Sequence, residues 1–99
     1  MAWKTLKKLL ASAGAEPLSA SSIKCRRALI QAARANSALV LIGDDSVATD
    51  RGIELVKPTA GSQISIVDLS AAYGNDIDLN SIYAKGTQND IVCIFYDEF

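Results

Sequence analysis

Short segments of strand length, each closed by turn-forming residues, fill the chain from residue 38 onward. They cover residues 38–42, 53–57, 63–67, 79–84 and 91–96. The first is an apolar run that ends at Gly43-Asp44-Asp45, and the second ends at Pro58. Apolar runs of this length and alternation with a period of two are typical of β-strands. Five or more such strands predict an all-β fold, a small antiparallel sandwich or barrel.

The same pattern predicts which side chains form the core. In each segment we assign one of the two faces to the interior, because successive side chains of a strand point to opposite sides. The residues expected to face inward are Leu39, Leu41, Ile64, Ile66, Ile91 and Phe95.

The first third of the chain supports two interpretations. One side of an amphipathic helix fits the apolar residues Trp3, Leu6, Leu9, Leu10 and Ala13, and residues 23–35 are rich in good helix formers. Glu16-Pro17 stops any helix there, and the Ser-rich residues after it indicate a connection into a new element. An α+β fold with a helix at about 23–35 therefore stands as the alternative to an all-β fold.

Length and composition limit the possible classes of protein. A chain of 99 residues forms one domain with one core. Its longest apolar run has five residues, far fewer than the roughly 20 of a membrane helix, and no signal peptide is recognisable, so we expect a cytosolic origin and no membrane partner.

The chain has no histidine, which removes the commonest general base and zinc ligand and weakens most hydrolase mechanisms. Cys25 and Cys93 lack metal or redox spacing and are expected to behave as small apolar core residues. We therefore expect no catalytic residue and no cofactor.

Charge is distributed unevenly along the chain. Residues 1–35 contain seven basic residues and one acidic residue, whereas residues 36–99 contain three basic and ten acidic residues. The basic third supplies the candidate partner-binding residues, which are Lys4, Lys7, Lys8, Lys24, Arg26 and Arg27. A second interpretation is that adjacent strands of opposite charge neutralise each other across one sheet.

One segment has the opening spacing of a calcium loop, Asp76-Ile77-Asp78-Leu79-Asn80. A calcium loop of this type needs Gly at its sixth position and Glu at its twelfth. Here those positions are Ser81 and Thr87, so we expect solvated loop acids and no metal site.

The order of several short signatures along the chain resembles a known group of proteins. The signatures are Leu18-Ser19-Ala20-Ser21, Ile30-Gln31-Ala32, Asn36-Ser37, Val40-Leu41-Ile42-Gly43-Asp44, Gly52-Ile53-Glu54-Leu55, Leu79-Asn80-Ser81-Ile82-Tyr83-Ala84-Lys85-Gly86, Asp90-Ile91-Val92 and Tyr96. This succession is similar to that of small virion proteins of tailed bacteriophages, namely capsid decoration or cement proteins and related head and fibre-base domains. The resemblance implies an antiparallel β-sandwich of jelly-roll type, a strand over 23–32, and no catalysis.

The resemblance also implies a function and partners. We expect a basic N-terminal arm or edge strand at 1–17 and a single β-sandwich domain at 18–99. The protein would be made in the host cytoplasm and lie on the capsid surface of the virion. There it would bind the major capsid protein, clamp neighbouring subunits and assemble with itself, on the family's pattern as a trimer. The alternative is a nucleic-acid-binding or regulatory module that uses the basic N-terminal third.

Overall fold

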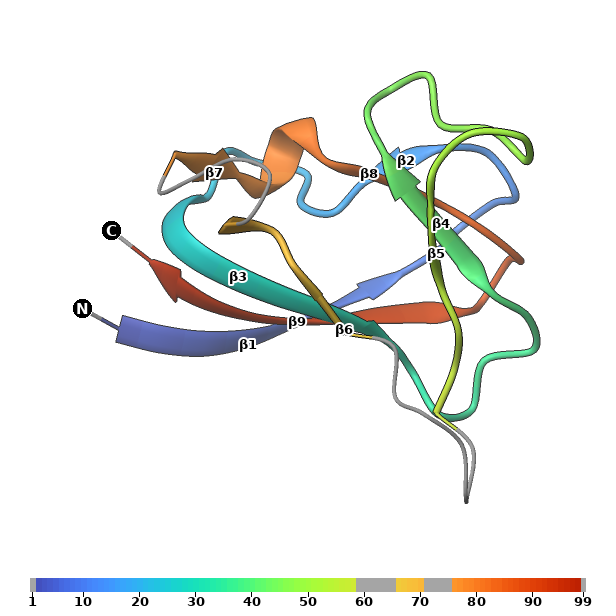
Figure 1. The fold of residues 1–99 in the computed structure, drawn as a ribbon, viewed down its shortest axis with the longest axis horizontal. Helices are drawn as coiled ribbons and strands as arrows, with labels where there is room; N and C mark the ends of the chain where they lie inside the picture. Colours follow the sequence, from blue (N-terminus) through green and yellow to red (C-terminus); the bar gives the residue numbers. More distant parts are fainter. Residues whose placement is uncertain (1, 59–65, 71–75, 99) are drawn as a thin grey trace.

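Two antiparallel β-sheets make up the protein (Figure 1). The structure is a computed structural model that describes residues 2–58, 66–70 and 76–98. One sheet has the strand order β1-β9-β3-β6, with β7 also paired to β3, and the other has the order β2-β8-β4-β5. The elements are β1 (Ala2–Leu9), β2 (Glu16–Pro17), β3 (Lys24–Ala32), β4 (Val40–Gly43), β5 (Ile53–Leu55), β6 (Ile66–Asp68), β7 (Ile77–Asp78), the 3-10 turn η1 (Leu79–Ser81), β8 (Tyr83–Lys85) and β9 (Ile91–Glu98). The predicted all-β class is confirmed.

Among the described strands, the first and the last form the most continuous pairing. β1 runs antiparallel to β9 from the pair Ala2–Glu98 to the pair Leu9–Ile91, so the two ends of the chain lie side by side (Figure 1). β1 is at the edge of its sheet. Its lysines fit that position, because charged side chains on an edge strand oppose uncontrolled addition of further strands.

The helix considered at 23–35 is not formed, and that alternative was wrong. β3 occupies Lys24–Ala32 and pairs with β9 on one side and with β6 and β7 on the other. Ala28, Ile30 and Ala32 alternate with more exposed residues and are buried. Helix propensity differs by less than about 1 kcal/mol per residue among ordinary residues, so pairing on both sides and burial of one face override it.

The core lies between the two sheets. Ile30, Val92 and Ile94 come from the β1-β9-β3-β6 sheet, and Val40 and Ile42 come from β4 in the other sheet. All five are almost completely buried. The facing of two apolar layers in this way explains why β3 and β9 largely alternate between a buried and an exposed side.

The predicted core selected the wrong face of several strands. Leu39, Ile66 and Phe95 are exposed, and Ile91 is only half-buried. Leu41 is buried but outside the main core cluster. The prediction for Ile64 lies outside the described residues. The error is a shift by one residue: β4 and residues 91–96 of β9 are continuously apolar in sequence, so nothing in the pattern distinguishes their two faces.

Two buried polar residues, Asn36 and Asp90, join the segment that follows β3 to the start of β9 by hydrogen bonds. The side-chain amide of Asn36 donates to the carbonyl of Ile91 at 2.9 Å, and its oxygen accepts from the N–H of the same residue at 2.8 Å. The carboxylate of Asp90 accepts from the backbone N–H groups of Ser37 at 2.9 Å and Ala38 at 3.2 Å. Because these side chains replace missing backbone partners, the connection can cross between the sheets without leaving these groups unsatisfied.

Candidate interaction surface

The side of the five-stranded sheet that points away from the core carries an apolar surface. We call it the outer face and define it by Trp3, Thr5, Lys7, Leu29, Gln31, Ile66, Cys93 and Phe95. Residues paired directly across strands share a side of the sheet. The register therefore forms one row from Thr5 through Phe95 to Leu29, and the next from Lys7 through Cys93 and Gln31 to Ile66.

Large apolar side chains on the outer face are open to solvent. Trp3 is 41% exposed, Phe95 44% and Ile66 55%. The rings of Trp3 and Phe95 are stacked, with centroids 4.6 Å apart and an angle of 23° between their planes. Exposed apolar residues scattered singly are ordinary on a protein surface, whereas a contiguous group on one sheet face makes that face a candidate for binding a partner.

The middle of the outer face is hollowed. The cavity has a volume of about 430 Å³. Its lining includes Thr5, Lys7, Leu29, Ile66, Cys93 and Phe95. This volume lies within the range of about 300–1,000 Å³ that ligand-binding clefts occupy. The hollow offers a partner apolar walls, with Lys7 and Thr5 as polar groups on the β1 side and Gln31 on the β3 side.

Five of the six basic residues singled out from the sequence are ion-paired. Lys4 pairs with Glu98 at 2.6 Å, Lys8 with Glu16 at 3.0 Å, Lys24 with Asp78 at 3.9 Å, Arg26 with Asp97 at 4.0 Å and Arg27 with Asp68 at 3.1 Å. Four of these carboxylates lie on strands that pair with β1 or β3. The basic first third of the chain is thus neutralised largely by the acidic strands beside it.

Lys7 is the sixth of these residues and differs from the other five. Within residues 2–58, 66–70 and 76–98 it makes no ion pair, and the internal segments 59–65 and 71–75 contain no acidic residue. It is exposed, lies opposite Cys93 in the β1–β9 register and lines the hollow. Among the residues that the structure describes, no carboxylate therefore offsets the charge of Lys7 at the edge of the apolar cavity.

Glu16 at the start of β2 secures the turn after β1. Its carboxylate accepts from the N–H groups of Ala11 at 3.2 Å and Ser12 at 2.8 Å, in addition to the ion pair with Lys8. Burial alone would raise the pKa of this group. The bonds from Lys8, Ala11 and Ser12 outweigh burial and lower the pKa of Glu16 to about 2. Lys8 thus stabilises the turn through its ion pair with Glu16.

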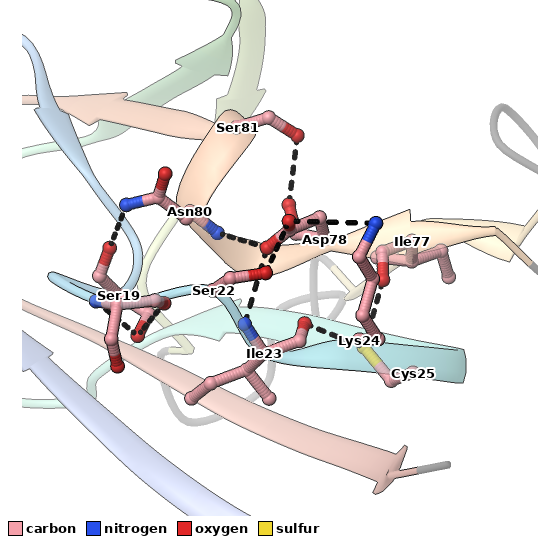
Figure 2. A network of polar contacts seen from close by, with 10 residues as sticks. Ser19, Ser22, Ile23, Lys24, Cys25, Ile77, Asp78, Asn80 and Ser81 are labelled. Atoms are coloured by element: carbon pink, nitrogen blue, oxygen red, sulfur yellow. Dashed lines mark hydrogen bonds and ion pairs between the residues drawn. The ribbon is translucent and has the colours of Figure 1, made fainter.

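The acidic segment considered as a calcium loop has a structural role at Asp78. Its carboxylate accepts from Ser22 Oγ at 2.6 Å and from the N–H groups of Ile23 at 3.2 Å and Asn80 at 3.0 Å, as Figure 2 shows. These bonds lower the pKa of Asp78. In the described part of the chain no cluster of three or more His, Cys, Asp or Glu residues could hold a metal ion.

The two cysteines have different surroundings. Cys25 is buried, and its thiol points to the carbonyls of Ile23 and Ile77 at 3.9 and 3.7 Å (Figure 2). Burial and nearby carboxylates raise the pKa of Cys25 to about 11, which makes it a poor nucleophile. Cys93 is exposed in the middle of the outer face, contrary to the sequence expectation that both cysteines are core residues.

Sequence reasoning missed the apolar members of the outer face. Phe95 and Ile66 were assigned to the core, and Trp3 was assigned to a helix stripe. One signal could have indicated a second apolar face, since β1 carries large apolar residues at odd positions, Trp3 and Leu9, as well as at the even position Leu6. A strand with apolar residues on both sides has two surfaces to cover, and one core can cover only one of them.

Comparison of this chain with protein-family models, curated proteins and solved structures found no match. Among the described residues, no helix has the length and apolar character needed to cross a membrane.

Proposed function

We propose that this protein is a non-enzymatic structural component of a phage virion. In this proposal it is a capsid decoration protein that binds the outer shell, clamps neighbouring capsid subunits and assembles with itself. The order of signatures from Leu18 to Tyr96 supports the virion assignment. We also propose that the strands are connected as in a jelly roll. The observation that carries a binding role is the exposed apolar outer face.

Several of the signature residues have a structural role in this fold, which supports using the signatures to assign the chain to a class of protein. Asn36 and Asp90 connect the end of β3 to the start of β9, and Gly43 ends β4. A segment order that is needed to build this fold would persist in proteins that share the fold. The signatures support only the fold, whereas the exposed apolar outer face supports binding to a partner.

Nucleic acid is a weaker candidate partner for this chain. Binding to phosphates requires lysines and arginines that are free to release counterions. Lys4, Lys8, Lys24 and Arg27 are already paired with carboxylates, which reduces the charge available to a phosphate backbone. We therefore propose the major capsid protein as the partner.

The proposal is tested by cosedimentation of the purified protein with undecorated heads of its own virus. We expect saturable capture at physiological salt and a loss of affinity of tenfold or more for Phe95→Ser and Ile66→Ser. Truncation of a central interface anchor commonly costs about 2 kcal/mol or more, which is roughly thirtyfold in affinity. Phe95 and Ile66 carry little of the fold's core, so both variants should remain folded.

Ile53→Ser and Val56→Ser are matched controls. Ile53 is 52% exposed and Val56 49%, similar to Ile66 and Phe95, but they lie on or just after β5 in the other sheet. Both should bind heads like the unmodified protein. Absence of capture by heads would reject the virion proposal, and equal losses in all four variants would reject the outer face as the binding surface.

A further inference from the structure

We infer that the hollow of the outer face receives an apolar side chain that has a carboxylate beside it on the partner protein, and that Lys7 pairs with this carboxylate. This inference rests on the proposed function, because it specifies the chemistry of the surface that the outer face binds. It is drawn from the shape, lining and charge of the hollow.

The apolar part of the ligand follows from the walls. Leu29, Ile66 and Phe95 surround the hollow from three neighbouring strands, and Trp3 extends this apolar area by stacking on Phe95. A side chain placed there would remove apolar surface of both partners from water, which is the main favourable term in protein association. The hollow is therefore shaped for an aromatic or large aliphatic anchor.

The anionic part follows from Lys7. On the same sheet Arg27 is satisfied by Asp68 at 3.1 Å, whereas Lys7 has no carboxylate among the described residues. Covering the hollow with a neutral surface would desolvate this ammonium without compensation. A carboxylate next to the anchor would supply the missing partner.

The same charge argues against a second copy of this chain on the outer face. Two outer faces packed against each other would bring two Lys7 side chains into one interface, with no carboxylate from the described residues to pair with either. Repulsion between like charges in a partly desolvated interface is unfavourable and selects against that pairing. We therefore assign the outer face to a different, acidic protein surface.

A small probe with this chemistry tests the inference without any virus particle. N-acetyl-L-phenylalanine carries an aromatic side chain beside a free carboxylate, and N-acetyl-L-phenylalaninamide is its neutral counterpart. Both are titrated into ¹⁵N-labelled protein at low salt, and amide shifts are followed by NMR. We expect shifts centred on Thr5, Lys7 and Cys93, with the carboxylate binding at least threefold more tightly than the amide.

Charge variants show whether Lys7 causes the preference. Lys7→Gln should abolish the preference for the carboxylate and leave binding of the amide unchanged. Arg51→Gln is the matched control, because Arg51 is an exposed cation between β4 and β5 of the other sheet and its loss changes the net charge equally. It should keep the preference.

Equal affinity for the two probes, no binding of either, or shifts centred away from the hollow would each overturn the inference. The outcome is separable from that of the head-binding experiment. Capture by heads with no carboxylate preference would reject the hollow's assigned ligand and leave the virion proposal in place. A Lys7-dependent preference without capture by heads would support the hollow's assigned ligand and reject the virion proposal.

Discussion

Ile94 and Phe95 are consecutive residues of β9 that belong to opposite sides of one sheet. Ile94 is 1% exposed and part of the core, whereas Phe95 is stacked on Trp3 in the outer face. We predict that Ile94→Ala lowers the free energy of unfolding by about 2–5 kcal/mol, because it leaves a cavity among packed side chains. Phe95→Ala should cost only about 1 kcal/mol, mainly the lost ring contact. Urea unfolding checks both, and a larger loss for Phe95→Ala than for Ile94→Ala would reverse the assignment of the two faces.

Asn36 should be one of the most sensitive polar positions in the chain. Asn36→Ala leaves both the N–H and the carbonyl of Ile91 without their side-chain partner. The carbonyl still accepts from the N–H of Ala33 at 3.0 Å, so only the N–H is left unsatisfied. At about 1–3 kcal/mol for an unsatisfied buried group, we expect a loss of that size in urea unfolding. Asn36→Asp keeps the acceptor but cannot donate to the carbonyl, so it should also be destabilised. Retention of stability by both variants would show that the amide is dispensable.

Acid should weaken the fold through Glu16. The pKa of this carboxyl is about 2 in the folded protein, below its ordinary value of 4.5. A group whose pKa falls on folding stabilises the folded state above its unfolded pKa, and that contribution is lost as the pH falls through the folded pKa. We predict that Glu16→Gln is less stable than the unmodified protein at pH 7 and that the difference shrinks between pH 4.5 and 2. Urea midpoints measured across this range check the prediction, and a difference independent of pH would contradict it.

The class of the fold could be predicted from the sequence because turn residues separate its strands. Gly43 ends β4 and Pro58 follows β5, as the pattern indicates. β3 could not be assigned from residue propensity alone, because its Ala, Leu, Gln and Arg residues favour a helix in isolation. Its strand depends on pairing with β9 and β6, which are far away in sequence.

The candidate surface was harder to predict than the fold. In continuously apolar segments such as Ile91–Tyr96, the sequence says that both faces are apolar but not which one is covered by the second sheet. The sequence also does not show which basic residues are ion-paired. Lys7 and Lys8 are adjacent, yet among the described residues only Lys8 pairs with a carboxylate, because the turn after β1 brings Glu16 next to it. Such contacts become visible only when the register of the strands is known.

The most direct test of the central claim, that the outer face binds the capsid, uses Cys93 as a reporter. Cys93 lies in the hollow and is exposed, whereas Cys25 is buried with a raised pKa and serves as an internal control. The rate of alkylation by iodoacetamide is measured for each cysteine by mass spectrometry, with the protein free and bound to undecorated heads. We predict that binding slows the reaction of Cys93 at least tenfold and that Cys25 stays unreactive in both states. Equal reactivity of Cys93 in the free and head-bound protein would contradict the account.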